Sequence, residues 1–158
     1  MCKSEELSLE DLLAHKPPMI LLSGYEAASF TEEGVRAWVD ISEDSLFYEE
    51  ATGGVPSSVG LEYMAQTIAC YVGLATRSRG ESPKVGFVLG TRNLSLGIPF
   101  FRRGVRYRIE TRLLFEDAGF ASFSARILDP AGECVSDGVI NAFQPEDPDK
   151  LLKERGEK

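Results

Sequence analysis

Apolar and polar residues alternate along much of the second half of the chain, and this period of two predicts β-strands. In residues 104–115 the apolar face holds Val105, Tyr107, Ile109 and Leu113, and the charged face holds Arg106, Arg108, Glu110 and Arg112. Residues 84–96, 120–128 and 133–143 are also rich in strand-forming residues. The turn sequences AG at 118–119 and DPAG at 129–132 separate these segments, so we expect antiparallel strands joined by turns.

The first half of the chain predicts two helices and a hairpin. Ser8 precedes a short apolar segment with acids in its first turn, which predicts a capped helix that ends by Lys16. Residues 19–30, after two prolines, and residues 35–40 are expected to pair as strands, and residues 42–54 to form a loop. Residues 57–76 are apolar on nearly every face, which is typical of a helix surrounded by other structure.

Together these elements predict an α+β fold in which an antiparallel sheet wraps around one long central helix. The 158 residues suit a single domain over 1–158. We expect its N-terminal helix within residues 1–16, its central helix at 57–76 and a charged tail at 145–158.

Composition narrows the possible sites and locations. The chain opens MCKSEELSLEDLL, which does not resemble a signal peptide. Its cysteines, Cys2, Cys70 and Cys134, are odd in number and not closely paired, which favours reduced thiols in a cytoplasmic protein. With one histidine and no cysteine cluster, we expect neither a metal nor a cofactor. Residues 55–75 are long enough to span a bilayer, but their polar side chains favour a buried helix instead.

Charge is distributed unevenly within a chain whose net charge is −8. Residues 77–112 contain nine basic residues and only two acidic ones. This basic segment is either a solvated strand face or a docking patch for an anionic partner. The candidates for docking are Arg102, Arg103, Arg106 and Arg108. The acidic net charge and the lack of a recognised motif argue against nucleic acid.

Glu62 is the only charged residue in VPSSVGLEYMAQTIACYVGLA, residues 55–75. A capping box would need Ser or Thr at position 59, which is Val, although Ser57 or Ser58 could still cap the helix. Glu62 could also lie on an exposed strip with Gln66, four residues later. The functional alternative is a carboxyl kept away from water, which stays protonated near neutral pH and acts as a general acid.

His15 is the only histidine, and therefore the only imidazole available as a general base. A lone histidine is more often structural than catalytic, so the sequence leaves both roles open. Ser57 and Ser58 raise the further alternative of a serine nucleophile, but no G-x-S-x-G motif surrounds them.

Several segments resemble one enzyme family. GLEYMAQ at 60–66, preceded by Val-Pro, resembles the central-helix motif of hot-dog-fold 3-hydroxyacyl-acyl carrier protein dehydratases. LLAHKPPMILLSGYE at 12–26 resembles their N-terminal segment. The similarity continues through GFVLGTRNLSL and IPFFRRGVRY to NAFQPEDPD, so it covers nearly the whole chain. These details are closer to the aryl-polyene-type, ApeP-like branch than to the fatty-acid-synthesis branch.

The resemblance implies a hot-dog dimer, homomeric or with a related subunit, around a tunnel for an acyl chain that acyl carrier protein delivers on phosphopantetheine. It implies that His15 removes the C2 proton and that Glu62 assists loss of the C3 hydroxyl, giving a trans-2-enoyl thioester. The backbone N–H of Ser57, at the start of the central helix, would donate to the thioester oxygen. The implied substrate-binding residues are Val55, Pro56, Gly60, Leu61, Met64, Gln66 and Ile68.

The sequence also departs from the family pattern. The fatty-acid branch carries its catalytic histidine in a G-H-F-P-G loop before the central helix, where this chain reads YEEATGGVPSS. Either His15 supplies the imidazole or the subunit lacks a base. The usual Pro-His-Arg is Ala14-His15-Lys16, and an expected Ala-Trp pair is Ser57-Ser58. Three functions stay open: a carrier-protein-dependent dehydratase, a thioesterase on the same fold, and a non-catalytic acyl-binding or partner subunit.

Overall fold

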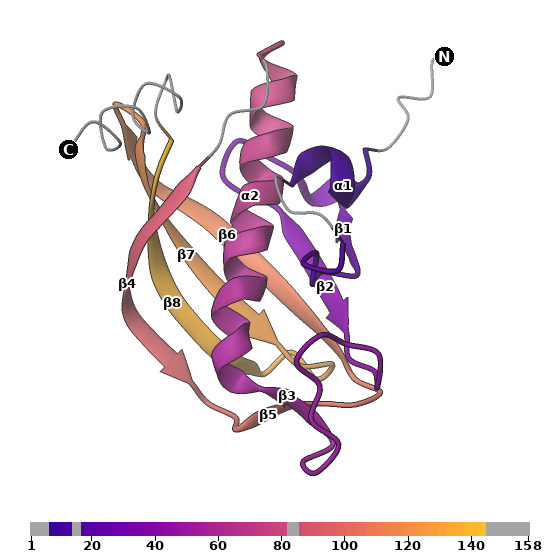
Figure 1. The fold of residues 1–158 in the computed structure, drawn as a ribbon. Helices are drawn as coiled ribbons and strands as arrows, with labels where there is room; N and C mark the ends of the chain where they lie inside the picture. Colours follow the sequence, from indigo (N-terminus) through magenta and orange to yellow (C-terminus); the bar gives the residue numbers. More distant parts are fainter. Residues whose placement is uncertain (1–6, 14–16, 82–85, 145–158) are drawn as a thin grey trace, which may run out of the picture.

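The computed structural model describes residues 7–13, 17–81 and 86–144, and within them a curved antiparallel sheet wraps around one long helix (Figure 1). The sheet contains, in spatial order, β1 (Gly24–Glu26), β2 (Arg36–Asp40), β6 (Arg106–Asp117), β7 (Phe120–Leu128), β8 (Cys134–Phe143) and β4 (Phe87–Leu96). A second, two-stranded sheet pairs β3 (Gly54–Pro56) with β5 (Phe100–Arg102). The helices are α1 (Leu9–Leu12), α2 (Gly60–Ser78) and the 3₁₀ turns η1 (Ala27–Ser29) and η2 (Ser57–Val59). The predicted α+β arrangement is confirmed.

The alternating pattern of the second half places its residues as predicted. On β6, Tyr107 and Ile109 are buried while Arg106 and Arg108 are exposed. The hairpin partners continue this division, because Ile109 pairs with Ile127 on the buried face and Glu110 pairs with Arg126 on the outer face. On β6 and β7 one face is therefore apolar and covered by α2, and the other carries charge.

Aromatic side chains join α2 to the sheet. Tyr63 meets Phe101 edge-on with ring centroids 5.3 Å apart, and Phe101 meets Tyr107 at 5.0 Å. One further pair, Tyr71 and Phe123, packs at 5.6 Å towards the other end of the helix. Such edge-to-face pairs add to the stabilisation that comes from burying the rings. They fix α2 along its length against β6 and β7.

The strand predicted over residues 19–30 is shorter than expected. Only Gly24–Glu26 pair with β2, and Ala27–Ser29 form a 3₁₀ turn. The reason lies in the backbone groups of Met19 and Leu21, which bond to the side chain of Gln66 on α2 instead of to a neighbouring strand. The extended segment before β1 therefore runs along the helix and not within the sheet.

The short helix α1 packs against the second half of α2. Ser8 and Asp11 form a reciprocal capping box at its start, as the predicted capped helix requires. The Arg77 guanidinium donates to the Asp11 carbonyl oxygen at 2.6 Å. Gly73 allows close approach, because a Cβ atom there would lie only 2.9 Å from the Leu12 carbonyl oxygen. The glycine in the middle of α2 therefore leaves the space into which α1 packs.

Gly73→Ala is therefore expected to destabilise the fold although alanine is the better helix former. The added methyl group forces α1 away from α2, and overpacking of this kind typically costs about 1–3 kcal/mol. Urea denaturation measures the change in the free energy of unfolding. Gly90→Ala is a control, because nothing lies within 4 Å of a Cβ atom at that position. Equal stability of Gly73→Ala and the wild type would show that α1 does not depend on this contact.

Candidate functional site

Glu62 lies in the first turn of α2 and is half-buried. The chain enters this turn from β3, whose Val55 is fully buried opposite the equally buried Phe101 of β5. Gly60 follows at a point where an added Cβ would lie 2.9 Å from the Phe101 ring. The start of the helix is therefore fixed by the second sheet.

The side chain of Gln66 bonds to Glu62 from one turn further along α2. Gln66 Nε2 donates to Glu62 Oε1 at 3.1 Å and to the Met19 carbonyl oxygen at 2.8 Å. Gln66 Oε1 accepts from the Leu21 N–H at 2.9 Å. One fully buried amide thus connects the carboxyl of Glu62 to the extended segment before β1.

Neither of the simple structural roles considered for Glu62 fits this arrangement. The exposed-strip hypothesis is wrong for Gln66, which has no exposed surface. The capping alternative also needs correction, because no side chain caps the start of η2 or α2 and the N-cap position of α2 is Val59. The helix begins through the 3₁₀ turn η2, so neither Ser57 nor Ser58 has the cap geometry.

The backbone N–H of Ser57, predicted to meet the thioester oxygen, donates to the Pro99 carbonyl oxygen at 3.0 Å. This bond continues the pairing of β3 with β5 one step beyond Pro56. Because this N–H is already used within the protein, Ser57 has no part in the mechanism proposed below.

The predicted substrate-binding residues divide by burial. Val55, Gly60, Met64, Gln66 and Ile68 are buried, whereas Pro56 and Leu61 keep part of their surface exposed. Leu61 adjoins Glu62 and is partly exposed, as are Ala65, Ala69 and Val72 along the same side of α2. That side of the helix is apolar but only partly covered by this chain. Substrate binding by the predicted set stays a prediction.

His15 lies outside the described residues. The described segments before and after residues 14–16 are both tied to α2. Leu12 sits against Gly73 on one side, and on the other Met19 and Leu21 bond to Gln66.

The four predicted docking arginines are not equivalent. Arg103 pairs with Glu43. Arg106 makes two bonds to Asp40, at 2.7 and 3.0 Å, and its guanidinium lies 5.1 Å from the centroid of the Trp38 ring. Arg102 and Arg108 are exposed and make no ion pair with any residue that the structure describes. These two carry the uncompensated charge of the predicted patch.

Other ionisable groups near the core serve packing. Burial raises the pKa of the Cys70 thiol to about 12, so it is neutral and unreactive at pH 7. Burial also raises the pKa of Tyr63 well above its ordinary value. The described residues contain no cluster of metal-ligating side chains, and none of their helices is long and apolar enough to cross a membrane.

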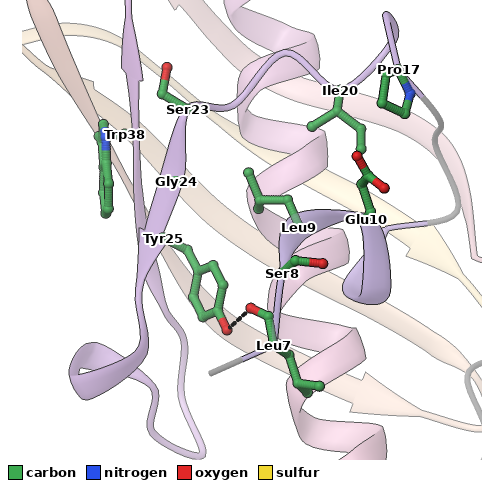
Figure 2. A pocket seen from close by; sticks show the side chains of 10 residues that line it. All are labelled: Leu7, Ser8, Leu9, Glu10, Pro17, Ile20, Ser23, Gly24, Tyr25 and Trp38. Carbon is green, nitrogen blue, oxygen red and sulfur yellow. Dashed lines mark hydrogen bonds between the residues drawn. The ribbon is translucent and has the colours of Figure 1, made fainter. Parts of the chain in front are cut away.

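A groove that Glu62 does not line lies beside the edge strand β1 (Figure 2). It has a volume of about 770 Å³ and runs between Leu7–Glu10 on one side and Ser23–Tyr25 on the other. The Tyr25 hydroxyl donates to the Leu7 carbonyl oxygen at 2.5 Å across it. A smaller cavity of about 290 Å³ reaches α2 at Tyr63. Neither the groove nor this cavity includes Glu62 among its lining residues.

Comparison with known proteins shows clear similarity. The family model of ApeP-like proteins, described as ApeP dehydratase, matches residues 7–153. The dehydratase heterocomplex ApeI:P from Xenorhabdus doucetiae contains a chain that is 28% identical, with a TM-score of 0.84 over 94% of this chain and 97% of that one. No curated protein sequence matches the chain.

Two less similar structures share the fold alone. A hypothetical thioesterase from Streptococcus pneumoniae with coenzyme A is 16% identical, with a TM-score of 0.58 over 78% of this chain and 88% of that one. A Streptococcus mutans protein bound to acetyl coenzyme A is 12% identical, with a TM-score of 0.60 over 82% of this chain and 95% of that one.

Proposed function

Because the chain belongs to the ApeP-like dehydratase family, we propose that it takes part in the dehydration of a 3-hydroxyacyl thioester, carried by acyl carrier protein, to a trans-2-enoyl thioester. The pathway we propose is fatty-acid-like or aryl polyene biosynthesis. The observation that carries the proposal is Glu62, a carboxyl in the first turn of the central helix that the buried Gln66 holds in place.

The chemistry needs one acid and one base. The base removes a proton from C2, the C2–C3 double bond forms, and the C3–O bond breaks. The acid gives its proton to the departing hydroxyl, which leaves as water. We propose Glu62 as the acid, because it is a carboxyl in the first turn of the central helix and the buried Gln66 holds one of its oxygens. We propose His15 as the base on the sequence alone.

A second subunit would complete the site. Edge strand β4 is long, and Val88, Leu94 and Leu96 on it are exposed. The apolar side of α2 with Leu61 is also only partly covered. An open apolar edge usually pairs with another chain. We propose a hot-dog partner there, either a second copy or a related subunit, and the heterocomplex formed by the ApeI:P relative supports this.

The exposed apolar edge of β4 and the partly covered side of α2 also favour a second candidate function. If the partner supplied both catalytic groups, this chain would be a non-catalytic acyl-binding subunit. Purified chain assayed alone with a 3-hydroxyacyl carrier-protein thioester distinguishes the two functions, since formation of the enoyl product requires catalytic groups from this chain. A thiol-reactive dye tests the thioesterase alternative in the same assay, because only hydrolysis releases the free carrier thiol.

Charge reversal at Arg102 and Arg108 is expected to weaken use of the carrier-bound substrate. Carrier proteins of this class would present acidic surface, and these two arginines carry unpaired charge within the described residues. We expect Arg102→Glu/Arg108→Glu to raise the KM for the carrier thioester, with added salt causing a similar loss in the wild type. Activity on a small carrier-free thioester should be unchanged.

Arg103→Glu is the matched control, because Arg103 is already paired with Glu43. Loss of activity on both substrates in the double variant would show that Arg102 and Arg108 support the fold or the site, and would contradict a docking role.

A further inference from the structure

Every polar group of the Gln66 side-chain amide makes a hydrogen bond within the protein. A primary amide has two N–H donors, and here they go to Met19 and to Glu62, while the amide oxygen accepts from Leu21. The side chain has no exposed surface. Gln66 therefore cannot reorient without breaking its bonds to these backbone groups and leaving its own buried amide unsatisfied, which is unfavourable.

The two backbone partners determine which way this amide faces. The Leu21 N–H can only donate, so it requires the oxygen of Gln66. The Met19 carbonyl can only accept, so it requires the nitrogen. With the amide fixed in this orientation, the second N–H of Nε2 points at Glu62 Oε1 and holds that oxygen as an acceptor.

We infer that Gln66 is a positioning residue for the acid Glu62. Glu62 Oε1 accepts a hydrogen bond from Gln66 Nε2, so the acidic proton of Glu62 cannot lie between these two atoms. The proton therefore belongs on the other oxygen, Oε2. Gln66 thereby fixes both the rotation of the carboxyl and the oxygen that delivers the proton. This inference rests on the proposed function of Glu62, and it assigns to Gln66 a role other than substrate contact, since its side chain is fully buried.

The test compares Gln66→Met with Thr67→Val in the full chain. Methionine keeps the shape of glutamine but makes none of the three bonds. Thr67→Val is the matched control, because Thr67 is equally buried and loses one hydrogen bond, to Tyr63, without contact to Glu62. Each variant is assayed under conditions where denaturation curves show it folded. We expect Gln66→Met to lower kcat by about 10- to 100-fold, as misplacement of a catalytic group does, with KM nearly unchanged, and Thr67→Val to retain both.

A pH profile separates positioning from loss of packing. In Gln66→Glu the carboxyl introduced at position 66 would contact that of Glu62, and the two would share a proton. The limb of the pH–rate profile that reports loss of the acidic proton should therefore move to higher pH. The Thr67→Val profile should superimpose on that of the wild type. If Gln66→Met keeps the wild-type kcat, or the Gln66→Glu profile is unmoved, this inference is overturned while the proposed function stands. If the wild type itself forms no enoyl product, the proposed function fails first.

Discussion

Glu62→Gln is expected to lower the dehydration rate by about 10²–10⁴-fold, which is the usual contribution of a general acid. Glutamine has the shape of glutamate but no acidic proton to give. Its side-chain oxygen can still accept from Gln66 Nε2, the bond that Glu62 Oε1 makes in the wild type. The fold should therefore change little. The measurement is enoyl product formed from a 3-hydroxyacyl carrier-protein thioester, with urea denaturation as the control for stability.

His15→Ala should cause a loss of similar size if His15 is the base. Two groups that act in one step are not additive, so the double variant should lose far less than the product of the single effects. The wild-type pH–rate profile should be bell-shaped, and its limbs belong to the interacting pair rather than to either residue. Nearly full activity in Glu62→Gln or in His15→Ala would refute the assigned role.

The sequence was sufficient for the parts of the fold that depend on local pattern. Alternation on β6 placed Tyr107 and Ile109 in the core because a strand puts successive side chains on opposite faces. The turn around Gly132 followed in the same way from a residue with φ of +84°, which glycine adopts easily. These features are encoded within a few residues of one another.

Features that depend on distant partners were not predictable in this way. Gln66 was considered as part of an exposed strip, because its backbone partners Met19 and Leu21 lie more than forty residues earlier in the chain. The same bonds shorten the strand that the apolar pattern of residues 19–30 predicts. Periodicity reports which side chains are apolar but not which backbone groups a distant side chain will bind.

The candidate site shows the same limit. Glu62 was identified from one charge in an apolar segment, and it lies in the first turn of α2; its catalytic role stays a prediction. The hydrogen bond from the Ser57 N–H to the Pro99 carbonyl oxygen could be predicted only by knowing that β3 pairs with β5. The pairing of Arg103 and Arg106 with acids some sixty residues earlier also required the fold. Residue type indicated the chemistry, and tertiary structure decided which groups were available for it.

Ala69→Arg is expected to separate the chain from its partner subunit. Ala69 lies on the partly covered apolar side of α2, with Ala65 and Val72 as its neighbours on that side. The described residues leave these side chains only partly covered, while the opposite side of the helix packs on the sheet. A charged side chain would be tolerated by the isolated chain, because the position is not fully buried. It would not be tolerated inside an interface, where an unpaired charge loses its hydration.

Substitutions at the centre of an interface typically cost about 2–4 kcal/mol, which is roughly 30- to 900-fold in the dissociation constant. Light scattering at micromolar concentration should therefore show a dimer for the wild type, or a complex with a co-purified related subunit, and a monomer for Ala69→Arg. Ala28→Arg is the matched control, because Ala28 is exposed next to β1 at the opposite edge of the sheet from β4. If the site needs both subunits, activity should fall together with assembly in Ala69→Arg and remain in Ala28→Arg. A wild-type chain that stays monomeric with and without a related subunit would contradict the proposed assembly, and an Ala69→Arg variant that still assembles would show that the interface lies elsewhere.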